Sequence, residues 1–251
     1  MDHARDVIRR AIDISHKKRR RTNRISEYFW GSDVNDYSEE EIHAELCYAE
    51  NYIMYGFLTF AQDQSIFALI KAAYRIKVGN DTYNSCQQIL QRRKSWERES
   101  LRKHFESGVC TGVGTSNLIL SHLPSRLIKV LAWVGFSGDR TEAIRNLKAA
   151  AAIRDGLRYK IVALITISFN LYMEQYYGLG KGDISWSRQL IHDLHQQFPK
   201  GVLVLAFLGR LRQLSGETDK AIECFQEALR VPIEWVQVHN ICFWELTWCY
   251  A

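Results

Sequence analysis

The sequence predicts an all-α protein, an α-solenoid in which antiparallel helix pairs stack one on another. Three observations lead to this fold class. A turn followed by spaced small and apolar residues recurs along the chain, at Gly138, Gly182 and Gly216. No segment alternates polar and apolar residues with the period of two that is typical of a strand. The 251 residues include only three prolines, so few positions force a helix to end.

Residues 1–37 are expected to form a basic N-terminal helix and a linker. Residues 1–25 hold nine Lys or Arg against three Asp, so the rest of the chain carries a net charge of −1. A neutral body argues against nucleic-acid binding, which needs positive charge spread over a face. The N-terminus lacks the apolar stretch of a secretion signal. The six cysteines form no CxxC pair, which suits the reduced thiols of an intracellular protein.

Five adjacent cations form a basic patch within this segment: Lys17, Lys18, Arg19, Arg20 and Arg21. Such a run could be a nuclear import signal, a contact for anionic lipid or a nucleic-acid arm. It could equally be the solvated end of a helix over residues 3–16, where cations complement the helix dipole. Because the remaining body is close to neutral, we expect the run to govern localisation or lipid attachment and not folding.

Residues 38–251 are predicted to be the helical-repeat domain, with the clearest repeats in 130–251. Its first helix begins at a capping box, Ser38 with Glu41, and no breaker interrupts the apolar pattern until about residue 60. Three segments follow: a helix over 65–78 interrupted at 79–81, a charged exposed helix or linker over 91–104, and a helix over 105–123.

Three glycines in the last of these helices, Gly108, Gly112 and Gly114, invite comparison with a phosphate-binding loop. No GK[ST] follows them and no strand precedes them. Gly108 and Gly112 share one helical face, where small residues let two helices approach closely. We therefore expect them to serve helix packing.

The clearest repeat starts at residue 202. Leu208 and Gly209 precede a turn at Gly216 and a second helix with small and apolar positions at Ala221, Phe225 and Ala228. The small residues let the paired helices approach, while Leu208 and Phe225 fill the space between them. Gly182 lies 34 residues before Gly216, the period of a tetratricopeptide repeat. The spacing from Gly138 to Gly182 is larger, which predicts a longer first helix around residues 159–177.

The first helices of such a solenoid line a concave surface that binds partners. Arg210 and Gln213 are candidates from one first helix, and Gln237, Asn240 and Trp244 from the next. Arg210 could hold a carboxylate of a partner peptide, and Trp244 could offer a flat apolar wall. The alternative is an ordinary polar face with a core tryptophan.

Catalytic and metal sites have little support. His192 with His195, and His239 with Cys242, have spacings that a metal could use, but only Cys249 is nearby as a third ligand. No nucleophile has a base at a recognised spacing. We expect no enzyme activity, no metal and no cofactor.

Four stretches resemble the tetratricopeptide repeat protein 39 family, which has fungal relatives in inclusion-body clearance: HAELCYAENYIMYGFLTF, FESGVCTGVGTSNLILSHLPSRLIKVLAWVGFSGDR, FPKGVLVLAFLGRL and HNICFWELTWC. The resemblance covers residues 38–251. It implies an intracellular helical-repeat protein without known catalytic activity or cofactor, and it supplies no functional residues. Members are usually longer, so we expect a fragment or short form truncated at the C-terminus. Its last helix, 236–250, would then expose apolar surface that self-associates or takes a partner helix.

The expected function is that of a non-catalytic scaffold or adaptor that binds protein partners through its concave groove in the cytoplasm. The alternative is a membrane-peripheral protein of lipid or inclusion handling that docks on an anionic membrane through its basic N-terminus. A nuclear location is also compatible with the basic patch, and no nucleic-acid partner is expected. The sequence does not identify the partner or the pathway.

Overall fold

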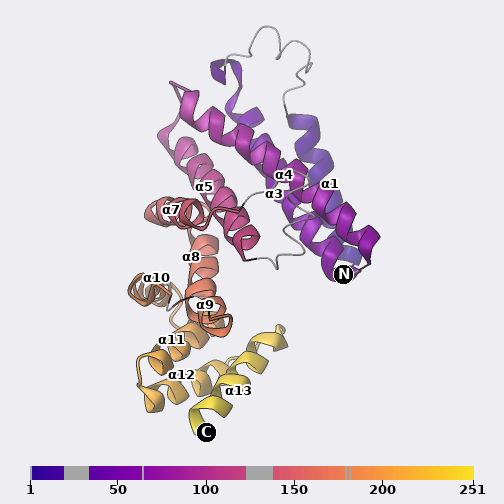
Figure 1. Ribbon diagram of the computed structural model, residues 1–251. Helices are drawn as coiled ribbons and strands as arrows, with labels where there is room; N and C mark the ends of the chain where they lie inside the picture. The colour runs from indigo at the N-terminus through magenta and orange to yellow at the C-terminus, as the bar shows by residue number, and fades with distance from the viewer. Residues whose placement is uncertain (1, 20–33, 64, 123–137, 179, 181) are drawn as a thin grey trace. The chain divides into compact units, whose positions relative to one another are not determined.

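The computed structural model describes residues 2–19, 34–63, 65–122, 138–178, 180 and 182–251, and all regular structure in these ranges is helical (Figure 1). The chain divides into two compact units, Met1–Tyr159 and Lys160–Ala251. In each unit, helices that follow one another along the chain pack together. The predicted all-α repeat fold is therefore confirmed. Within the described ranges, no helix has the length and apolar character that a membrane span needs.

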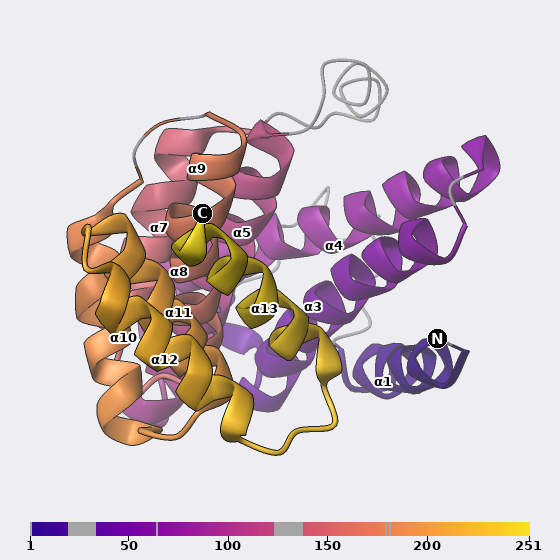
Figure 2. The same ribbon diagram turned by 90° about the horizontal axis from the view of Figure 1, so that it is seen from below.

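The first unit consists of α1 (Asp2–Lys18), η1 (Val34–Asp36), α3 (Glu39–Gln62), α4 (Ile66–Arg92), α5 (Glu99–Ser121) and α7 (Arg140–Ala152). α3 and α4 lie side by side, α1 packs along α3, and α5 contacts α4 and α7 (Figures 1 and 2). The predicted capping box begins α3: Ser38 Oγ accepts a hydrogen bond from Glu41 N, and the Glu41 carboxylate accepts one from Ser38 N.

The prediction that Gly79 interrupts the second long helix is wrong, because α4 continues through it to Arg92. A Cβ at Gly79 would lie 2.8 Å from Ile53 Cγ1 and 3.0 Å from the Ala49 carbonyl oxygen. The glycine thus serves the close approach of α3 to α4 and not a turn. The charged segment 91–104 divides between the end of α4, a short connection and the first residues of α5.

The glycines of α5 have the predicted packing role. A Cβ at Gly108 would overlap Leu46 of α3, and one at Gly112 would overlap the ring of Tyr83 of α4. Leu46 and Tyr83 are both buried in the core of the first unit. Glycine at these two positions therefore lets α5 lie directly against the α3–α4 pair.

Part of the basic patch contacts α3. Lys18 forms an ion pair with Glu40, and Arg19 Nε donates to Glu45 Oε2 at 2.7 Å. Glu45 is buried, so it would lose its charge partner if Arg19 were replaced. Arg19 is thus the position of the run that we expect to contribute to the stability of the first unit. Arg20 and Arg21 lie outside the described residues, and Lys17 is exposed to solvent.

The N-terminal helix is not separate from the helices that follow it. Ile12 of α1 shares a buried cluster with Tyr48 and Tyr55 of α3. α1 is thus part of the first compact unit, whereas the predicted boundary at residue 37 would place it outside.

A continuous helical rod consists of α8 (Tyr159–Ser168), the π-helical turn η2 (Phe169–Met173) and α9 (Glu174–Tyr176), and all of it except Tyr159 belongs to the second unit. The unit continues with α10 (Ile184–Gln197), α11 (Val202–Leu214), α12 (Thr218–Arg230) and α13 (Val236–Tyr250). Figure 2 shows α11 and α12 side by side, with α13 following them.

The spacing of the predicted repeats accounts for the positions of the turns and of the core residues in this unit. Gly182 and Gly216 have φ of +65° and +77°, values that favour glycine, and each directly precedes the residue before a helix. Gly138 stands at the same place before α7 in the first unit. Ala221, Phe225 and Ala228 are fully buried, while Leu208 is half-buried. A Cβ at Gly209 would lie 2.6 Å from the Phe225 ring, so this glycine admits the ring between α11 and α12.

Candidate functional site

An apolar groove of about 680 Å³ lies between three elements of the second unit: the rod α8–η2–α9, α11 and α13. In the predicted repeats, each of these three elements is the first helix of its pair. First helices are expected to line a concave surface. The groove has the size of a typical ligand site, about 300–1,000 Å³. Its wall consists of Ser168, Tyr172, Met173, Tyr176, Leu203, Ala206, Phe207, Trp235, Val238, Asn240, Ile241, Trp244 and Glu245.

Large apolar side chains in this wall are open to solvent. α13 buries Val238 and Cys242 in the core that it shares with α11 and α12. Ile241 and Trp244, on the groove side of α13, are 43% and 55% exposed, and Met173 across the groove is 42% exposed. The helix thus shows the apolar surface that the sequence predicts for residues 236–250.

A buried ion pair ties the three groove elements together. Arg210 of α11 donates from Nη1 to Glu245 Oε2 of α13 at 3.0 Å and from Nε to the Leu171 carbonyl oxygen of η2 at 3.2 Å. The Glu245 side chain is fully buried. Its Oε1 accepts a hydrogen bond from the Tyr176 hydroxyl at 3.1 Å, and that hydroxyl accepts one from Trp244 Nε1 at 3.2 Å.

The π-helical turn explains how Arg210 reaches the rod. A π turn shifts the regular hydrogen-bond ladder of an α-helix, and such turns often occur at functional sites. Leu171 lies in this turn, and its carbonyl oxygen accepts from the Arg210 side chain. The turn falls within residues 159–177, where the spacing of the repeats predicts a longer first helix.

The tyrosine hydroxyls and the cysteine thiol at the groove remain neutral near physiological pH. Burial, followed by the nearby Glu245 carboxylate, raises the pKa of both Tyr172 and Tyr176. The same two causes raise the pKa of Cys242 to about 11. Glu245 is the only acidic or basic side chain in the wall, and Arg210 compensates its charge.

The predicted groove residues take different positions. Asn240 and Trp244 line the groove, whereas Gln237 is exposed but lies outside the wall. Gln213 accepts a hydrogen bond from Arg210 Nη1 at 2.6 Å. Arg210 is buried and its carboxylate partner is Glu245 of the same chain, so its guanidinium group is already engaged inside the protein.

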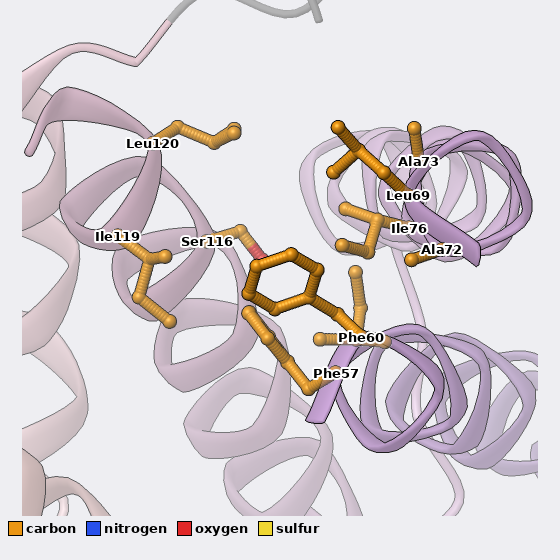
Figure 3. Close-up of a pocket in the computed structure, with 10 residues that line it drawn as sticks. Phe57, Phe60, Leu69, Ala72, Ala73, Ile76, Ser116, Ile119 and Leu120 are labelled. Atoms are coloured by element: carbon orange, nitrogen blue, oxygen red, sulfur yellow. The ribbon is translucent and has the colours of Figure 1, made fainter. Parts of the chain in front are cut away.

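A second, smaller apolar pocket lies in the first unit, between α3, α4 and α5. Figure 3 shows Phe57 and Phe60 of α3 pointing into it, with Ser116 of α5 as its polar member. Its volume of about 80 Å³ is below the range of ligand sites, about 300–1,000 Å³. The groove of the second unit is therefore the stronger candidate. In the described ranges, no three His, Cys, Asp or Glu side chains group in a way that could hold a metal ion.

Comparison with known proteins places the whole chain in one family. Residues 1–251 match the family model of Iml2/Tetratricopeptide repeat protein 39. The chain is similar to Tetratricopeptide repeat protein ttc-39B of Caenorhabditis elegans, with 30% identity over 255 residues covering 100% of this chain and 44% of that protein. The chain therefore spans less than half the length of this curated relative. No solved structure matches it significantly.

Proposed function

The chain belongs to the Iml2/Tetratricopeptide repeat protein 39 family, and from this premise we propose that it is a non-catalytic scaffold or adaptor. Its second unit binds a protein partner in the apolar groove between η2, α11 and α13. Helical repeats of this type present binding surfaces on their first helices.

The observation that carries this proposal is the solvent exposure of Met173, Ile241 and Trp244 around one groove. Contiguous apolar surface of this kind marks interaction sites in folded proteins. Tryptophan and tyrosine are enriched among the residues that dominate binding energy, and both occur in the wall. The partner is therefore recognised mainly through apolar contact.

Docking on an anionic membrane through the basic patch has less support. Glu40 and Glu45 pair with Lys18 and Arg19, so two of its cations are already compensated within the first unit. A membrane contact would have to rely on the remaining positions of the run.

Two substitutions on α13 test the proposed groove. Ile241→Glu places a charge in the wall, whereas Phe243→Glu changes an exposed apolar residue, 58% accessible, outside the wall. We expect Ile241→Glu to weaken partner binding about tenfold or more, since it buries an unpaired carboxylate at the interface. Proximity labelling in cells should lose a set of proteins with Ile241→Glu and retain that set with Phe243→Glu.

Both variants should keep the melting temperature of the unmodified chain, because both side chains are exposed. If the labelled set is insensitive to Ile241→Glu, or depends equally on Phe243, the groove is not the binding site.

A further inference from the structure

We infer that the occupant of the groove is an α-helix with an uncharged apolar face, and not an extended peptide. The inference rests on the proposed function and specifies the partner's chemistry. It follows from the hydrogen-bonding capacity and the charge of the wall.

The backbone of the wall has few free N–H and C=O groups that could form hydrogen bonds with an extended peptide. Every lining residue except Trp235 lies within a helix. Away from the helix ends, where Leu203 and Tyr176 lie, backbone N–H and C=O groups bond along the helix itself. The described part of the second unit contains no β-sheet edge, so an extended peptide cannot bind there by pairing as an additional strand.

Three polar side chains of the wall, those of Glu245, Tyr176 and Trp244, are engaged within the protein. Both carboxylate oxygens of Glu245, the Tyr176 hydroxyl and the Trp244 indole N–H take part in the network around Arg210. Four polar groups of the wall take no part in this network: the side chains of Ser168 and Asn240, the Trp235 indole N–H and the Tyr172 hydroxyl, which is buried without a hydrogen-bond partner.

An extended peptide brings one N–H and one C=O per residue into the groove. Each such group that is buried without a partner costs about 1–3 kcal/mol. The four remaining polar groups of the wall, one of them the buried Tyr172 hydroxyl, cannot satisfy a segment of several residues. A helix has no such need, because its backbone groups are already paired.

The charge of the wall determines the face that such a helix presents. Glu245 is compensated by Arg210, so a charged residue on the buried face of the partner would find no counterion. Met173, Phe207 and Ile241 come from three different elements, and they offer apolar contact on both sides of the groove. Apolar residues spaced three and four apart on one helix face fit such a surface.

Paired peptide libraries test the inference on the full 251-residue chain. The first displays amphipathic helices with uncharged apolar residues varied at the i, i+3, i+4 and i+7 positions. The second is identical except for a central proline, which disfavours a helix by about 3 kcal/mol. Selection uses the unmodified chain only, so that the later measurements on Ile241→Glu and Phe243→Glu are independent of it. Synthetic peptides from each pool are then measured by fluorescence anisotropy.

We expect binders from the helical library only, with about tenfold weaker binding to Ile241→Glu and unchanged binding to Phe243→Glu. Binders of equal affinity from the proline library, or no binders from the helical one, would overturn the inference. Either result leaves the proximity-labelling test of the proposed function intact. Helical binders that ignore Ile241→Glu but lose affinity with Phe243→Glu would contradict the proposed function itself.

Discussion

Replacing Arg210 with methionine is expected to lower the free energy of unfolding by about 3–5 kcal/mol, the usual cost of removing one partner from a buried ion pair. Glu245 would be left fully buried without its cation, and the Leu171 carbonyl oxygen would lose its donor. Chemical denaturation followed by circular dichroism measures this change. Because the pair joins all three groove elements, the variant should also bind partners more weakly.

The double variant Arg210→Met with Glu245→Leu serves as the control. Apolar residues of similar size often replace a buried ion pair without loss of stability, so most of the lost stability should return. Partner binding should return to a smaller extent, because the links to Leu171 and Tyr176 remain absent. A single variant as stable as the unmodified chain would mean that the ion pair does not hold the groove together.

Replacing Gly112 with alanine is expected to destabilise the protein by about 1–3 kcal/mol or more, because the added methyl group overlaps the buried ring of Tyr83. Helix propensity alone predicts the opposite sign, since alanine stabilises a helix interior by about 1 kcal/mol relative to glycine. Thermal unfolding therefore separates the two effects by the direction of the change.

A compensating substitution identifies the cause of that loss. Tyr83→Leu removes the ring that the new methyl group meets, so the combination with Gly112→Ala should cost less than the sum of the two single changes. Additive losses, or a stabilising Gly112→Ala, would show that α5 does not depend on this close contact with α4.

Short sequence motifs predicted helix starts and turns correctly, because these features depend on residues that are neighbours in the chain. The capping box at Ser38 begins α3, and the turn glycine Gly216 separates α11 from α12. The same rules failed at Gly79, where the close approach of α3 to α4 decides the role of the glycine. A contact between two helices cannot be seen in the local sequence of either one.

Only part of the groove was predicted from the sequence, again because the local sequence of one helix does not show its contacts with another. The spacing of the repeats predicts Asn240 and Trp244, and two periods of 34 residues before them lie Tyr172 and Tyr176, which also line the groove. The pairing of Arg210 with Glu245 joins residues on successive first helices. No pattern in a single sequence indicates which carboxylate an arginine will contact. The sequence therefore did not show that Arg210 pairs with Glu245 inside the protein.

Photo-crosslinking from two positions on α13 tests the central claim most directly. A photoreactive phenylalanine at position 241 lies in the wall of the groove, and one at position 243 lies on the same helix outside it. Partner binding in the groove predicts a crosslinked protein from the probe that replaces Ile241, and little from the probe that replaces Phe243. Crosslinks of equal yield from both positions, or from the Phe243 position alone, would contradict the account.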